Sequence, residues 1–222
     1  MITYLLLVRH GENEWVRSNR LAGRTPEVFL NERGRQQSAT LAKELAKQPV
    51  SAVYSSPLER CVETAQPAAE VLGLPIVIEE GVLEGDFGDW QGQKLKDLAK
   101  LPEWKLVQQH PSSFQFPKGE SFRAMQFRAV AAIERIQQNH PNEIVVIFSH
   151  SDIIRISMAH YLGTPLDLFQ RIMISTASVS AIAFHDRKPS VLFVNRTSEL
   201  PVFELKKDEK PAETNAEQES TA

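Results

Sequence analysis

The stretch Leu5–Trp15, LLLVRHGENEW, opens with four apolar residues that run straight into an arginine, a histidine and a glycine. A short continuous apolar run of this kind is typical of a strand inside a parallel sheet that is covered on both faces. We therefore expect a strand over residues 3–8. Arg9 and His10 should emerge at its carboxyl end.

Apolar runs alternate with helical patterns along the rest of the chain. The expected strands are residues 3–8, 50–55, 75–80, 143–149, 178–184 and 190–195. The expected helices are residues 32–47 with Asn31 as N-cap, 57–72, 93–109 with an interruption at Pro102, a helix whose apolar stripe runs from Phe122 to Ile136, and 152–162. This alternation predicts an α/β fold, a three-layer α/β/α sandwich around a mainly parallel sheet.

The helix expected after strand 50–55 begins with a favourable signature. Ser56 and Pro57 are a natural N-cap and first helical residue, and they place Arg60 in the first turn. Helix N-termini offer unpaired backbone N–H groups and a positive potential. We therefore expect Arg60 to help hold an anion.

The bulk composition argues against several classes of protein. The 222 residues carry a formal net charge of −3, whereas nucleic-acid binders usually have a basic excess. The single cysteine, Cys61, excludes an internal disulfide and favours a reducing compartment. The N-terminal apolar run is too short to span a membrane and lacks the flanks of a signal peptide. We expect a cytoplasmic protein that binds neither nucleic acid nor a membrane.

Several polar groups are expected to meet at one edge of the sheet. In parallel α/β folds, ligands bind outside the carboxyl ends of the strands. Arg9, His10, Arg60 and His150 all follow closely on apolar strands. Together they predict a compact cationic pocket.

The residue types in this pocket favour a phosphate monoester. Two arginine forks can offset a phosphate dianion, and neither histidine has enough neighbouring carboxylates or thiols to favour a metal ion. A histidine can act as the covalent nucleophile of phosphoryl transfer, and His10 is the candidate. The departing alkoxide needs a proton, for which Glu84 in the glycine-rich loop 83–92 is the candidate.

These motifs, in this order, resemble the histidine phosphatase superfamily, which includes the cofactor-dependent phosphoglycerate mutases. The motifs are Arg9-His10-Gly11, Ser55-Ser56-Pro57 with Arg60, the loop from Glu84 to Gly92, and Ser149-His150 before a helix. Leu21-Ala22-Gly23-Arg24 and the segment 118–122 also resemble the bacterial phosphoglycerate mutase-like branch of that superfamily. The similarity runs over roughly residues 3–197 and implies a phosphoglycerate mutase-like fold.

The resemblance implies roles for individual residues. A phosphohistidine would form on His10, Arg9, Arg60 and His150 would clamp the phosphate, and Glu84 would act as proton donor and then acceptor. It implies three further substrate contacts: Asn13, Gly23 and the backbone of Ser151. No metal or other cofactor is expected.

We expect residues 1–205 to form a single catalytic domain of this kind. From Lys206 onward the chain is polar, with charges of both signs and no aromatic residue. Segments of this composition cannot bury enough apolar surface to fold. Residues 206–222 are therefore predicted to form a disordered tail.

Three departures from the mutase pattern favour a phosphatase. Val16 stands where the mutases have asparagine, and Ser151-Asp152 where they usually have two glycines. The connection from Glu84 to Gly119 is also shorter than a mutase needs to enclose a second phosphate. Asp152 would repel a phosphate if it pointed inward, but near a helix start it can serve the N-terminus instead.

The leading hypothesis is therefore a metal-independent phosphomonoesterase acting on a small phosphate ester. The alternatives are a phosphoglycerate mutase that uses a bisphosphorylated primer, and a phospho-ligand binding module without catalysis. The leaving group and the oligomeric state stay open. The sequence leaves two alternatives open for five cations, contact with a carboxylate or second phosphate of the substrate, or exposure to water: Arg17, Arg20, Arg24, Lys105 and Lys118.

Overall fold

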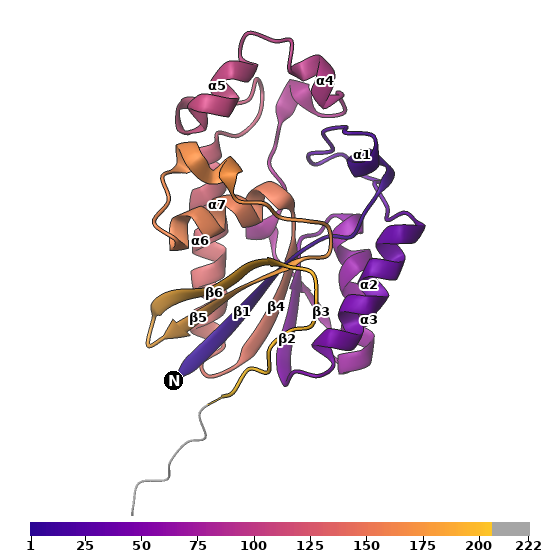
Figure 1. Cartoon of the computed structure of the whole chain (residues 1–222), viewed down its shortest axis with the longest axis vertical. Helices are drawn as coiled ribbons and strands as arrows, with labels where there is room; N and C mark the ends of the chain where they lie inside the picture. Colours follow the sequence, from indigo (N-terminus) through magenta and orange to yellow (C-terminus); the bar gives the residue numbers. More distant parts are fainter. Residues whose placement is uncertain (206–222) are drawn as a thin grey trace, which may run out of the picture.

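The computed structural model describes residues 1–205, and its centre is a six-stranded sheet in the order β3-β2-β4-β1-β5-β6 (Figure 1). The strands are β1 (Ile2–Arg9), β2 (Val50–Ser55), β3 (Ile76–Ile78), β4 (Ile144–Ser149), β5 (Val179–His185) and β6 (Lys188–Arg196). The first four run parallel to one another, whereas β5 and β6 are antiparallel to their neighbours. The predicted mainly parallel sheet is confirmed.

Helices cover both faces of this sheet, so the α/β/α sandwich is also confirmed (Figure 1). One face carries α2 (Glu32–Leu45) and α3 (Glu59–Leu72), and the other carries α6 (Phe122–Asn139) and α7 (Ser151–Tyr161). Alternate residues of β1 point to opposite faces: Leu5 and Leu7 pack with α6 and α7, while Leu6 and Val8 pack with α2 and α3. Both faces are buried, which explains why this strand is apolar throughout.

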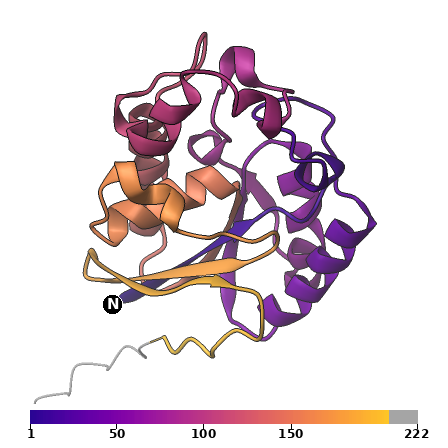
Figure 2. The ribbon, with the colours of Figure 1, turned by 45° about the horizontal axis from the view of Figure 1, so that its top comes forward.

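Short helices cover the carboxyl ends of the parallel strands. They are α1 (Glu14–Arg17), α4 (Leu95–Leu98) and α5 (Trp104–Gln109). Figures 1 and 2 show the N-terminal loop with α1 beside α4. A bridge between Arg20 and Lys94, and a hydrogen bond of 2.9 Å from the Leu95 amide to the Asn19 carbonyl, join the two segments. This cap closes over the strand tips where the pocket was predicted.

Some predicted boundaries are wrong for identifiable reasons. Helix α3 begins at Glu59 rather than at residue 57, and its N-cap is Leu58, without a side-chain cap hydrogen bond. Ser56 is buried instead, and its hydroxyl lies 2.8 Å from His150 Nε2, so it is unavailable as a cap. The region 93–109 forms the two short helices α4 and α5, and the loop after Gly11 contains α1.

Other local predictions are confirmed. The Asn31 side chain accepts a hydrogen bond of 2.9 Å from the Gly34 amide and caps α2, and Gly73 ends α3 in the left-handed conformation. The predicted tail, residues 206–222, lies outside the described residues. Within residues 1–205, no helix combines the length and apolar character needed to cross a membrane.

Candidate active site

The carboxyl ends of β1, β2 and β4 lie side by side at one edge of the sheet. The His10 amide donates to the Ser149 carbonyl at 3.0 Å, and the Ser56 amide donates to the Phe148 carbonyl at 2.9 Å. The rings of His10 and His150 lie edge to face with centroids 5.4 Å apart. A cavity of about 560 Å³ opens here. Seven of the eight predicted site residues line it, namely Arg9, His10, Asn13, Gly23, Arg60, Glu84 and Ser151.

The His10 ring has the protonation state that a nucleophile requires. It is 4% exposed, and its Nδ1 lies 2.8 Å from the Gly11 carbonyl oxygen. Burial, with the charges of Arg60 and Arg9, lowers the pKa of His10 well below its ordinary value. The imidazole is therefore neutral, Nδ1 donates its proton to Gly11, and Nε2 keeps a free lone pair.

Gly11 is required by close packing rather than by a turn conformation. A Cβ at this position would lie 2.7 Å from the Gly34 carbonyl oxygen at the start of α2. The Gly11 amide donates to Thr64 Oγ1 on α3 at 2.9 Å. Helices α2 and α3 thus hold the backbone that orients the His10 ring.

The half-buried Arg9, the buried Arg60 and one side-chain amide form the cationic wall. Arg9 Nη1 donates to the Ile174 carbonyl and Arg60 Nη2 donates to the Gly23 carbonyl, each at 2.7 Å. Several buried N–H groups have no partner within the described residues: Arg9 Nε, Arg60 Nε and Nη1, and Asn13 Nδ2. Unpaired buried donors are costly, and anion binding at this wall would lower that cost.

Asn13 combines two functions. Its Oδ1 accepts a hydrogen bond of 2.8 Å from the Val16 amide and so caps α1. The side-chain amide Nδ2 is left without a protein partner at the cavity wall. This orientation agrees with the predicted donation from Asn13 to a phosphate oxygen.

Glu84 has the properties of a general acid. It is 8% exposed, and Oε1 accepts from the Gly85 amide at 2.9 Å. Burial, followed by repulsion from Asp152, raises the pKa of Glu84 from 4.5 to about 7. The carboxyl group is therefore protonated over much of the range below neutral pH.

The loop that carries Glu84 is held by arginines whose role the sequence did not indicate. Arg128 on α6 donates to the Leu83 carbonyl at 2.6 Å and to the Glu84 carbonyl at 3.0 Å. Arg24 Nε also donates to the Glu84 carbonyl, at 2.9 Å. Both guanidinium groups pair with Glu120 at 2.9 Å. This network fixes the backbone of Glu84 while its carboxyl group faces the cavity.

His150 is the predicted site residue that does not line the cavity in the described part of the chain. It is fully buried, with Nε2 2.8 Å from Ser56 Oγ and Nδ1 3.8 Å from Glu84 Oε2. Burial and the charge of Arg60 lower its pKa well below the ordinary value. Cys61 lies behind it, and burial raises the pKa of that thiol to about 12, as expected of an inert buried cysteine.

The five cations left open by the sequence separate into three groups. Arg20 lines the cavity and lies over the Trp15 ring, with 5.2 Å to its centroid. The Arg24 side chain supports the Glu84 loop. The remaining three do not line the cavity: Arg17 pairs with Glu14, Lys118 pairs with Asp89, and Lys105 is exposed.

Asp152 and Arg155 on α7 also line the cavity. In the sequence, Asp152 stood out only as a departure from the mutase pattern, and nothing indicated a role for Arg155. The two alternatives expected for Asp152 hold together, because it lies in the first turn of α7 and also lines the cavity. Residues 1–205 contain no group of three or more His, Cys, Asp or Glu side chains arranged to hold a metal ion.

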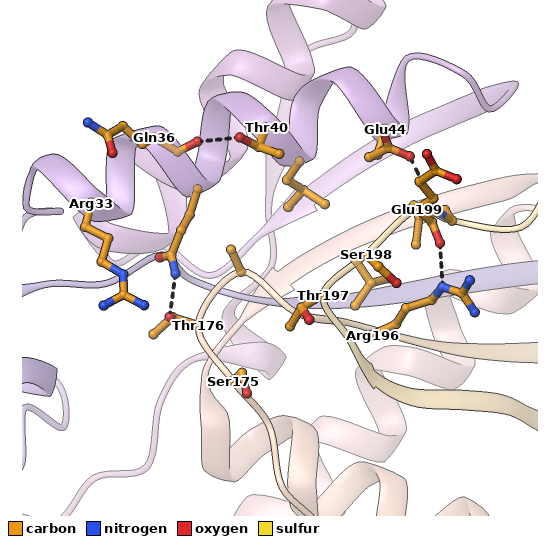
Figure 3. Close-up of a pocket in the computed structure, with 15 residues that line it drawn as sticks. Arg33, Gln36, Thr40, Glu44, Ser175, Thr176, Arg196, Thr197, Ser198 and Glu199 are labelled. Carbon is orange, nitrogen blue, oxygen red and sulfur yellow. Dashed lines mark hydrogen bonds between the residues drawn. The ribbon is translucent and has the colours of Figure 1, made fainter.

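A second groove, of about 720 Å³, lies between α2 and the segments 175–179 and 196–200 (Figure 3). Arg33 pairs with Glu12 at 3.4 Å, and Arg196 donates to the Glu199 carbonyl at 2.5 Å. None of the predicted site residues lines this groove. Its arginines are engaged with the protein, so we assign the site to the cavity at the strand tips.

Comparison with known proteins agrees with this geometry. A family profile described as "Histidine phosphatase superfamily (branch 1)" matches residues 5–197. Phosphoserine phosphatase 1 of Hydrogenobacter thermophilus is 33% identical over 201 residues, 90% of this chain and 95% of the relative. A metal-independent phosphoserine phosphatase of Arabidopsis thaliana is 34% identical over 198 residues, 84% of this chain and 79% of the relative.

The fold agrees with solved structures as well. The phosphoserine phosphatase of Entamoeba histolytica, solved in complex with 3-phosphoglyceric acid, superposes with a TM-score of 0.82 at 25% identity. That superposition covers 90% of this chain and 100% of the other. The sequence motifs, the sheet order and the family match coincide, and the chain belongs to the histidine phosphatase superfamily.

Proposed function

We propose that this phosphomonoesterase hydrolyses small phosphate esters in two steps through a phosphohistidine on His10. The observation that carries the proposal is the neutral, buried His10 ring, whose Nδ1 is engaged with Gly11 while Nε2 is left free. Arg9 and Arg60 stand beside it as phosphate ligands. The phosphatases among its relatives support the same class of reaction.

In the first step, His10 Nε2 attacks phosphorus and the ester P–O bond breaks. Glu84 gives its proton to the departing alkoxide, which leaves as an alcohol, and Glu84 becomes a carboxylate. The phosphorylated ring keeps its proton on Nδ1. The Gly11 carbonyl oxygen, 2.8 Å away, stabilises the positive charge that develops there.

In the second step, the Glu84 carboxylate takes a proton from a water molecule whose oxygen attacks phosphorus. The P–N bond breaks, orthophosphate leaves, and both His10 and Glu84 return to their starting states. A pKa of about 7 suits Glu84 to both proton transfers, because the group gives and accepts protons readily near neutral pH.

The cationic wall stabilises the charge on the transferring phosphoryl group. Arg9, Arg60 and the Asn13 amide donate to its equatorial oxygens, as the pattern of unpaired N–H groups favours. Gly23 and the Ser151 backbone border the same space. His150 Nδ1 lies 3.8 Å from Glu84 Oε2. We propose that His150 helps to orient the carboxyl group of Glu84.

A phosphorylated three-carbon acid is the proposed substrate class, with O-phosphoserine as the first compound to assay. The cavity of about 560 Å³ is of small-molecule size. The relatives named as phosphoserine phosphatases, and the complex with 3-phosphoglyceric acid, favour this class. A coupled enolase assay would test the mutase alternative, since a mutase interconverts phosphoglycerates faster than it releases phosphate.

The decisive experiment is phosphate release by the His10→Ala variant. The loss of the nucleophile should lower kcat for p-nitrophenyl phosphate and O-phosphoserine by a factor of about 10³ or more. Wild-type enzyme quenched in alkali should carry an alkali-stable, acid-labile phosphohistidine that the variant lacks. Activity of the wild type should survive EDTA, because the proposed chemistry uses no metal.

The matched control is His185→Ala, which removes an exposed histidine at the end of β5 and should retain full activity. Full activity of His10→Ala would overturn the proposal. Measurable binding of phosphate esters without any phosphoenzyme or phosphate release would instead support the binding-module alternative.

A further inference from the structure

Two oppositely charged side chains on the first two turns of α7 line the cavity. They lie next to the end of the cavity at which the phosphate is proposed to bind, here called the phosphate end. Arg155 Nη1 lies 3.2 Å from Asp152 Oδ1, and the two side chains are 22% and 24% exposed. Their spacing of three residues places them on one face of the helix. Among the described residues, Asp152 and Glu84 are the only carboxylates that line the cavity.

A carboxylate is an unexpected component of an anion-binding cavity. Asp152 repels a phosphate dianion, and its charge also opposes ionisation of Glu84. The N-terminus of α7 favours an acidic residue, but an acid that faced solvent would make the same interaction. A carboxylate that lines the cavity disfavours purely anionic substrates and favours those that also carry a positive charge.

We infer that Asp152 and Arg155 together bind the α-amino acid head group of the substrate, Asp152 receiving the ammonium and Arg155 the carboxylate. This inference rests on the proposed function, which places the phosphate at His10. An amino acid holds its ammonium and carboxylate on one carbon atom. The adjacent carboxylate and guanidinium of the pair present the complementary charges at a similarly short separation.

The position of the pair fits a short phosphorylated amino acid. Asp152 is two residues from His150, and the charges of both Asp152 and Arg155 affect the pKa of Arg9 in the phosphate wall. One methylene group separates the ester oxygen from the α-carbon in O-phosphoserine. The head group of such a substrate therefore lies close to its phosphate, as the pair lies close to Arg9.

Arg155 has further donor capacity for a carboxylate. Its Nη1 is engaged with Asp152, and its buried Nε has no partner within the described residues. The guanidinium fork binds carboxylates through two parallel hydrogen bonds. A substrate carboxylate would satisfy donors that the protein leaves open.

Two nearly isosteric substrates test the role of Asp152. 3-Phospho-L-glycerate differs from O-phospho-L-serine only by a hydroxyl group in place of the ammonium group. Asp152→Asn should lower the ratio of kcat/KM for phosphoserine to that for phosphoglycerate by about tenfold or more, because an ammonium–carboxylate hydrogen bond is lost. The ratio should be measured between pH 5 and pH 8, since a changed pKa of Glu84 would affect both substrates alike.

The matched control for this variant is Asp97→Asn. Asp97 also lies in the first turn of a helix and also pairs with a cation three residues later, Lys100, at 3.0 Å. It does not line the cavity, so its substitution should leave the ratio at the wild-type value. Thermal unfolding of both variants separates a loss of helix stability from a change in substrate preference.

A second substrate pair tests Arg155. O-Phosphoethanolamine keeps the ammonium group and lacks the carboxylate. Arg155→Gln should lower the ratio of kcat/KM for phosphoserine to that for phosphoethanolamine by about tenfold. An unchanged ratio would show that Arg155 does not bind the carboxylate and would overturn its part of the inference.

Failure of the inference differs from failure of the proposed function. Equal effects of Asp152→Asn on phosphoserine and phosphoglycerate, or a wild-type preference for phosphoglycerate, would overturn the inference while His10-dependent phosphatase activity persists. Activity that is independent of His10 would overturn the proposed function itself.

Discussion

The two ends of the cavity are built differently. At the phosphate end, Arg9, His10 and Arg60 stand next to strand tips, and the backbone around them is hydrogen-bonded to neighbouring strands and helices. The leaving-group end is lined by segments from distant parts of the sequence, including Trp15, Trp104 and Gln170. We therefore expect the chemical step to depend on the residues near the strand tips, and substrate choice to depend on the cap and α7.

Among the substitutions that compare the two ends of the cavity, Glu84→Gln should have the largest effect on kcat. The substitution should lower kcat for O-phosphoserine by about 10²–10⁴-fold, because the alkoxide then leaves without a proton donor. The loss should be much smaller for p-nitrophenyl phosphate, whose leaving group is a stable anion. Equal losses for the two esters would contradict the assignment of Glu84 as general acid.

The same residue sets an expected pH dependence. The pKa of Glu84 is raised to about 7, so the proton that the leaving group needs is lost as the pH rises through that value. The kcat/KM for alkyl phosphates should therefore fall above about pH 7, and Glu84→Gln should remove this limb. A pH profile for p-nitrophenyl phosphate is the control, because protonation of its leaving group matters little.

An intermediate effect is expected for Gly23→Ala at the phosphate end. Gly23 has a φ of +55°, and a Cβ would lie 2.3 Å from Gln91 Oε1. The carbonyl of Gly23 accepts from Arg60, so a shift of this backbone should lower kcat/KM by about tenfold for all esters alike, as expected for a small displacement of a clamp residue.

Gly92→Ala is the matched control for that substitution. Gly92 has a φ of +82°, but a Cβ there would meet no atom within 4 Å. It should lose about 1 kcal/mol of stability through backbone strain and retain its activity. A loss at Gly23 that depended on the ester would contradict the separation of the two ends.

The smallest effect is expected for Ser56→Ala. This change removes the hydroxyl that lies 2.8 Å from His150 Nε2, and the buried Nε2 then keeps only the weaker contact with Cys61 Sγ, at 3.4 Å. We expect a loss of about 1–3 kcal/mol in the free energy of unfolding and a few-fold fall in kcat/KM for every ester. Ser55→Ala is the control, because that buried hydroxyl donates to the Ser56 carbonyl and does not contact His150.

Much of the fold was predictable because its strands carry a simple signal. The continuous apolar runs of β1 and β4 indicate strands that are buried on both faces, and the following helical patterns indicate parallel connections. The start of α3 was mispredicted because Ser56 satisfies a long-range hydrogen bond with His150 instead of a local cap. A local pattern contains no information about such a competing partner.

The sequence by itself determined which groups stand at the strand tips, because Arg9, His10 and His150 are joined covalently to the ends of apolar strands. Only the tertiary structure decided how Glu84 is held by Arg24, Arg128 and Glu120, and how Asp152 and Arg155 line the same cavity. These arrangements depend on packing between segments far apart in the chain. Periodicity within one segment reports its own burial, whereas the direction of a side chain toward a distant partner is settled when the elements pack together.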